Sequence, residues 1–171
     1  LLRMLLKRNA ELSQEMGGSE ACFLACGSGE GMALAGERFR LLSPDGSARK
    51  EGGVEELPGM LKEEPLPHTF LKQALTVEGT PFRVGPLARL AAAGVLGTPM
   101  AEAELAELRD QGGWPSQRAM LAHAARMVEM VHAWERMVVL LGDEALTGEE
   151  VRIPISPACL LYTSPEPTRL L

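Results

Sequence analysis

One stretch decides the fold class of this chain, because it predicts a long amphipathic helix. It runs from Gln117 to Leu141 and reads QRAMLAHAARMVEMVHAWERMVVLL. Ser116 and Pro115 open it and Gly142 closes it, which are ordinary helix start and stop signals. Apolar residues recur in steps of four and three, as in the buried seam of a bundle helix. The predicted seam comprises Met120, Ala124, Met127, Val131, Trp134, Val138 and Leu141.

Further apolar residues spread around the sides of this predicted helix and leave only a narrow polar strip. The strip comprises Arg118, Arg126, Glu129, His132 and Arg136. A helix of this kind needs neighbours on several sides, and one short helix with a small sheet would cover it poorly. We therefore expect partner helices from sequence outside this chain or from another subunit.

The region before the long helix predicts shorter elements. Thr98 and Pro99 begin a second helix that ends near Arg109. Further upstream, apolar runs separated by turn residues predict a small antiparallel β meander. These runs are Ala21 to Cys26, Met32 to Leu34 and Arg38 to Leu42. The predicted fold class is α+β and mainly helical, with long bundle helices beside the meander.

Three other segments carry weaker signals. Residues Leu1 to Met16 have helical spacing and predict the end of a helix. A short helix is predicted from Val54 to Lys62, broken by Pro58-Gly59, and a loop follows from Pro65 to Lys72. The residues from 158 to 171 show neither helical nor strand period, and we expect them to be a non-native tail. Residues 1–157 are then one incomplete structural region.

The composition excludes several classes of function. The 171 residues include 17 basic and 23 acidic side chains, a net charge of −6, which gives no electrostatic footprint for nucleic acid. No apolar run reaches the roughly 18 residues that cross a bilayer, so we expect no membrane span. With 46% hydrophobic residues the chain can build a core. Three cysteines, an odd number, fit a reducing compartment, and we expect a cytoplasmic protein.

Residue patterns alone predict neither a catalytic nor a metal site. Cys22 and Cys26 have three residues between them rather than two, so no C-x-x-C pair exists. His123 and His132 are too far apart on the long helix to form a zinc pair, and His68 stands alone in an irregular segment. The glycine-rich run from Gly27 to Gly31 matches no phosphate-binding fingerprint and predicts a hairpin turn.

A nine-residue segment, Phe82 to Leu90, carries a more specific signal. It reads FRVGPLARL: a short strand-like entry, a Gly85-Pro86 turn, and two arginines around small and apolar residues. The segment resembles the R-V-G-P-L-A-R stretch in the large subunits of nickel-iron hydrogenases, especially the soluble type coupled to NAD or a deazaflavin. The similarity extends from about Met32 to Pro154. It includes Glu63-Glu64 to Lys72, Gly97 to Leu105, and the helix from Ala124 to Arg136.

This resemblance implies an internal fragment of a hydrogenase large subunit, in which long helices form a central bundle. The intact parent would cleave or form dihydrogen heterolytically at a nickel-iron centre. A small subunit with iron-sulfur clusters would be its partner, and diaphorase-type subunits are further candidates. The family holds its metal with two C-x-x-C pairs, which this chain lacks, so the chain alone should bind no metal and be inactive. The motif residues Arg83, Gly85, Pro86 and Arg89 either lie near the cofactor or act as scaffold.

Two other interpretations remain open. One is a metal-free relative that serves as a structural or docking subunit, as in respiratory complex subunits related to this family. The corresponding turn in that relative usually has the form G-P-x-L-R, whereas Arg89 here follows Gly85-Pro86-Leu87-Ala88. The other is an unrelated helical interaction module, which would fold cooperatively on its own.

Overall fold

The computed structural model describes Met4 and residues 18–27, 31–110 and 113–148. The chain divides into two compact units, Leu1–Arg136 and Met137–Leu171. The helix predicted within Leu1 to Met16 lies, apart from Met4, outside the described residues, as do the centre of the Gly27 to Gly31 run and the predicted tail from 158 to 171. The elements described below belong to the first unit unless stated otherwise.

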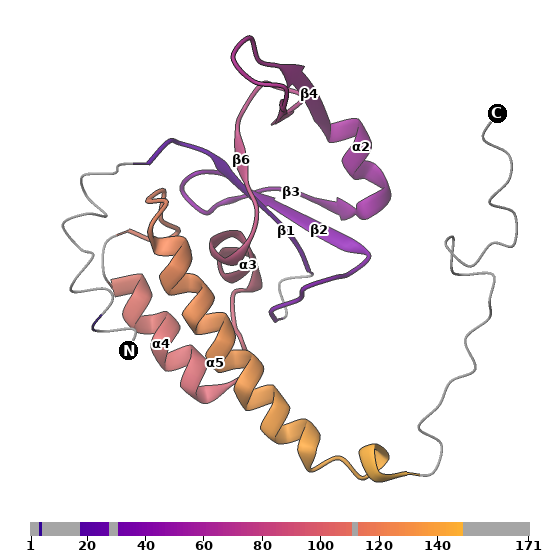
Figure 1. Ribbon diagram of the computed structural model, residues 1–171, viewed down its shortest axis with the longest axis vertical. Helices are drawn as coiled ribbons and strands as arrows, with labels where there is room; N and C mark the ends of the chain where they lie inside the picture. The colour runs from indigo at the N-terminus through magenta and orange to yellow at the C-terminus, as the bar shows by residue number, and fades with distance from the viewer. Residues whose placement is uncertain (1–3, 5–17, 28–30, 111–112, 149–171) are drawn as a thin grey trace, which may run out of the picture. The chain divides into compact units, whose positions relative to one another are not determined.

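A four-stranded sheet forms the centre of the first unit (Figure 1). Its strands, in the spatial order β3-β2-β1-β6, are β3 (Ala48–Gly53), β2 (Arg38–Leu42), β1 (Cys22–Cys26) and β6 (Phe82–Arg83). The predicted antiparallel meander is confirmed for β1 and β2, whereas Met32 to Leu34 form no strand and the third strand is β3, which the sequence analysis did not predict. The prediction of a purely antiparallel sheet is wrong, because β6 pairs with β1 in parallel. Strands β3 and β6 run in the same direction, and the long connection between them carries the chain back to the end of the sheet where β3 begins, which a tight hairpin cannot do.

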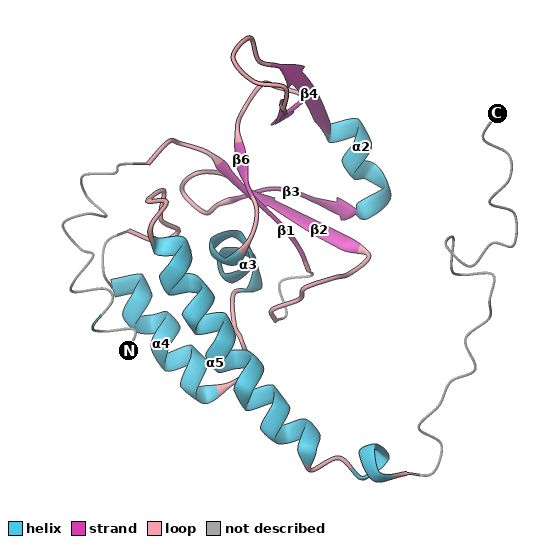
Figure 2. Cartoon of the chain, viewed as in Figure 1, coloured by secondary structure: helices cyan, strands magenta, loops and turns pink. Residues whose placement is uncertain are grey.

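Three helices cover one face of this sheet: α3 (Pro86–Ala93), α4 (Pro99–Asp110) and the start of α5 (Leu121–Leu141) (Figure 2). Phe23 and Ala25 of β1 point toward these helices, because alternate residues of a strand face opposite sides. The main core forms here, with Leu90, Leu105 and Val128 fully buried. Thr98 immediately precedes α4 and Pro99 begins it, as predicted.

The opposite face of the sheet carries a smaller core, in which Phe39 and Leu41 pack with Met60 of α2 (Leu57–Met60). A single 3-10 turn, η1 (Val54–Glu56), leads into α2. The predicted break at Pro58 is wrong: Pro58 occupies the first turn of α2, where its missing N–H is tolerated.

A two-stranded hairpin, β4 (Leu61–Pro65) and β5 (Lys72–Thr76), continues from α2. The sequence analysis predicted none of it. Charged side chains hide the strand pattern, since Lys72 pairs with Glu63 and Lys62 with Glu64 on the exposed hairpin. The segment between the two strands is irregular, as predicted.

Helix α5 confirms the long amphipathic helix, but it begins at Leu121 rather than Gln117 and its buried stripe matches the predicted seam only in part: Ala124 is buried, and Met127 and Val131 pack against the core. The buried residues are Leu121, Ala124, Ala125, Val128 and His132. Trp134, Val138 and Leu141 are exposed, at 54%, 52% and 80%. Apolar residues surround this helix, so periodicity alone cannot decide which of two adjacent stripes faces the core. None of the helices in the described residues combines the length and apolar character needed to cross a membrane.

In the second unit, a 3-10 turn, η2 (Glu144–Thr147), follows the end of α5. The Asp143 side chain accepts a hydrogen bond from the Ala145 N–H at 2.9 Å and so caps this turn.

Candidate functional site

The motif segment forms a sharp joint between β6 and α3. Gly85 adopts φ 92° and ψ −159°, a conformation open essentially only to glycine. Pro86 follows as the first residue of α3, where its fixed φ suits the helix and its missing N–H is not needed. The predicted strand-like entry and Gly-Pro turn are therefore confirmed. The sequence folds this way because Gly85 can adopt the conformation that ends the strand and Pro86 favours the first turn of the helix that follows.

The two arginines of the motif tie this joint to other parts of the first unit. Arg89 projects from the first turn of α3 to Glu129 of α5: its Nε lies 2.6 Å from Oε1 and its Nη2 2.8 Å from Oε2. The Glu129 side chain is only 11% exposed. The hydrogen bonding that Arg89 donates to Glu129 raises the pKa of the guanidinium, against the opposing effect of burial. Arg83 donates through Nη2 to the Ser19 carbonyl, 3.1 Å away.

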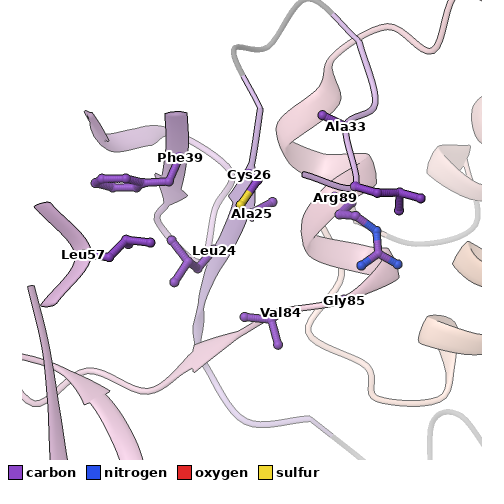
Figure 3. Close-up of a pocket in the computed structure, with 10 residues that line it drawn as sticks. Leu24, Ala25, Cys26, Ala33, Phe39, Leu57, Val84, Gly85 and Arg89 are labelled. Carbon is purple, nitrogen blue, oxygen red and sulfur yellow. The ribbon is translucent and has the colours of Figure 1, made fainter. Parts of the chain in front are cut away.

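An apolar groove of about 210 Å³ lies beside this joint, and we call it the β1–α3 groove (Figure 3). Leu24, Phe39 and Leu57 line one side of it, and Gly85 and Arg89 line the other. The remaining lining residues are Ala25, Cys26, Ala33, Leu34 and Val84. An apolar lining of this size accommodates one aliphatic or aromatic group rather than a metal or an anion, since a dry cavity of about 150 Å³ already holds benzene.

A polar cluster joins α4 to α5 on the helical side of the sheet. Glu135 accepts hydrogen bonds from the N–H groups of Met100 (3.0 Å) and Ala101 (2.8 Å), so α5 caps the first turn of α4. The hydroxyl of buried Thr98 lies 2.8 Å from Nδ1 of His132. Desolvation raises the pKa of Glu135, but the two N–H groups, Thr98 and nearby His132 lower it more, so the carboxyl pKa lies below its usual range.

The residues of the described ranges do not fit a nickel-iron centre. Such a centre needs soft thiolate ligands in close pairs. The Cys22 thiol is fully buried and lies 3.3 Å from the Arg49 guanidinium, whereas the Cys26 thiol lies in the apolar groove. In the described part of the chain, no group of three or more His, Cys, Asp or Glu side chains is placed so that it could hold a metal ion. We therefore derive no reaction step through a metal here.

The structure brings together only some of the residues that the sequence singled out. Gly85 and Arg89 share the groove, while Arg83 reaches away from it toward Ser19. His132 is buried against Thr98 rather than part of an exposed polar strip, which corrects that prediction. Sequence reasoning missed Glu129 as the partner of Arg89, because nothing local links residues 40 positions apart.

Comparisons with known proteins place this fold in context. No family model matches the chain. The chain is 32% identical over 126 residues to a subunit of the F420-non-reducing hydrogenase vhu of Methanocaldococcus jannaschii, a match that covers 71% of this chain and 30% of that protein. The corresponding vhu subunit of Methanococcus voltae is 31% identical over the same length and coverage. The chain thus spans about a third of the length of these relatives.

A solved structure shows the same fold. It is the crystal structure of an NAD+-reducing nickel-iron hydrogenase in the H2-reduced state, with a TM-score of 0.76 and 23% identity, and the match covers 91% of this chain and 36% of that one. The fold and the sequence match together relate this chain to hydrogenase subunits. This chain is related to the large subunit of nickel-iron hydrogenases and covers only a portion of it.

Proposed function

We propose that this chain is a central portion of a nickel-iron hydrogenase large subunit, and that the intact parent oxidises dihydrogen or reduces protons. The observation that carries this proposal is the 32% identity to a hydrogenase subunit over 126 aligned residues, joined to a fold shared with a hydrogenase chain. The metal ligands would come from C-x-x-C pairs outside this chain, since the sequence holds none. An iron-sulfur small subunit would be the partner, with diaphorase-type subunits as further candidates, in the cytoplasm.

Within that parent, the described portion serves as scaffold rather than as the reacting site. Its two motif arginines are already engaged: Arg89 binds a carboxylate through two N–H groups, and Arg83 binds a backbone carbonyl. A guanidinium held in a bidentate pair is positioned by that pair and ties two elements together. Arg83, Gly85, Pro86 and Arg89 would therefore fix the path of the chain from the sheet into the helices.

A graft tests the proposal directly. Residues Met32 to Pro154 of this chain replace the matched region of the Methanocaldococcus jannaschii vhu protein, and the complex is purified with its native partners. We expect bound nickel and hydrogen-dependent dye reduction above the level of a control graft in which the same residues are shuffled. A graft that assembles without nickel would favour the metal-free docking protein. A graft that behaves like the shuffled control would overturn both.

Sequencing the source DNA outward from this reading frame gives an independent check. Two C-x-x-C pairs, one on each side, are expected if the parent holds a nickel-iron centre. A start codon and a stop codon close to the described portion, with no such pairs between them, would refute the hydrogenase assignment.

A further inference from the structure

The β1–α3 groove coincides with an open edge of the central sheet. Strand β1 pairs with β2 from Phe23 to Cys26, but with β6 only at Cys22 and Phe23. At Val84 the chain leaves the sheet to form the joint with α3. No strand in the described residues therefore pairs with the second half of β1 on that side.

The register shows which backbone groups face this edge. Gly27 donates to the Arg38 carbonyl at 2.9 Å, so Gly27, Ala25 and Phe23 exchange hydrogen bonds with β2. In an antiparallel ladder, hydrogen-bonded residues alternate with residues that are not bonded to the partner strand. Leu24 and Cys26 are not bonded to β2, so their N–H and C=O groups point to the side away from β2. Cys22 follows the same alternation, because its N–H points away from β2 and donates to the Pro81 carbonyl, 2.9 Å away. Beyond β6, the Leu24 carbonyl and the Cys26 N–H thus face the groove.

The side chains around this edge are apolar. Leu24 and Phe39 form the buried floor, 8% and 1% exposed, while Val84 and Leu34 stand at the rim, 67% and 77% exposed. An extended segment lying here would pair its backbone with β1 and place one side chain in the groove. This combination of backbone pairing and a side-chain pocket is the basis of strand addition to a sheet edge.

We propose that an extended segment of the same large-subunit polypeptide, from outside this chain, occupies the β1–α3 groove as an added strand. The inference rests on the proposed function: the match covers only 30% of the relative's length, so most of such a protein lies elsewhere in its sequence. The strand carries an apolar side chain on the face toward Leu24, Phe39 and Leu57. The next residue faces α3 and is small, because Gly85 and the already paired Arg89 line that side.

The test uses the full 171-residue chain and synthetic peptides of about 12 residues, a length that suits strand addition. The peptides tile the part of the Methanocaldococcus jannaschii vhu protein outside the match. Binding is followed through the backbone amide signals of the chain by NMR. We expect one region of the relative to bind, to shift the amide of Cys26, and to slow its hydrogen exchange.

Two matched pairs of variants make the test specific for backbone pairing. Two peptides are compared, one with N-methyl groups on the odd-numbered residues and one with them on the even-numbered residues. The peptide methylated at the N–H groups that face β1 should not bind, and the other should bind as well as the unmethylated peptide. Cys26→Pro removes the edge N–H on the side away from β2, where proline is tolerated. It should weaken binding about two- to tenfold relative to Cys26→Ala, the effect of one net hydrogen bond. The peptide pair decides the matter if the proline variant fails to fold.

Three outcomes would overturn the inference. The first is that no peptide binds at about 1 mM, a concentration that reveals even weak association. The second is that the two N-methylated peptides bind equally well. The third is a dimer of the chain that Cys26→Pro dissociates, which would make a second copy the occupant. An active graft together with any of these results would refute the added strand alone, whereas an inactive graft would refute the proposed function.

Discussion

Replacement of Arg89 by alanine should destabilise the first unit more than any other single loss of a charge described here. The Glu129 carboxylate accepts both of its short hydrogen bonds from this guanidinium and is only 11% exposed. Arg89→Ala leaves that carboxylate without its cation. Removal of one member of a fully buried pair costs about 3–5 kcal/mol. Because Arg89 is 26% exposed and water can enter its place, we expect about 2–3 kcal/mol.

Urea unfolding of the full chain, followed by far-UV circular dichroism, measures this loss. Glu129→Ala should cost less, about 1–2 kcal/mol, since the remaining guanidinium can turn to solvent. The double variant should be less destabilised than the sum of the two, by about 1–2 kcal/mol. Arg126→Ala is the control, because it removes an exposed arginine from α5, the helix that carries Glu129. It should change the free energy of unfolding by less than about 0.5 kcal/mol. An Arg89→Ala variant as stable as the Arg126→Ala control would refute the scaffold role.

Three further predictions address other parts of the chain. Gly85→Ala should lower the free energy of unfolding by about 1–3 kcal/mol, because residue 85 has a positive φ that alanine adopts only with strain. Gly36→Ala is the control, since its added Cβ also meets open space but its φ is not positive. The pKa of Glu135 is lowered in the fold, so its contribution is present above the ordinary value of 4.5 and is lost as the pH falls below it; Glu135→Gln should flatten the acid limb of a thermal stability profile, and an unchanged limb would contradict the cap. The purified 171-residue chain should retain no stoichiometric nickel and show no hydrogen-dependent dye reduction, measured by metal analysis and a dye assay, because its three cysteines form no C-x-x-C pair.

The sequence predicted those elements whose signals are local. The Thr98-Pro99 start of α4, the Gly85-Pro86 turn and the end of α5 at Leu141 each follow from residues that lie next to one another. Features that depend on distant residues were missed. The parallel pairing of β6 with β1 joins residues 60 positions apart, and the charged β4–β5 hairpin shows no apolar alternation. The buried stripe of α5 was predicted only in part for the same reason, since the location of the core decides between two apolar stripes.

The contacts of the motif that reveals the relationship lie within the architecture of the first unit. Its glycine permits a backbone conformation, its proline begins a helix, and its arginines bind groups within the first unit. A metal-bearing hydrogenase and a metal-free docking relative would need the same joint, because both must pass the chain from the sheet into the helices. Agreement at Arg83 to Arg89 cannot distinguish these two classes of protein. The presence or absence of C-x-x-C pairs in the flanking DNA can, since nickel depends on thiolates that this portion does not supply.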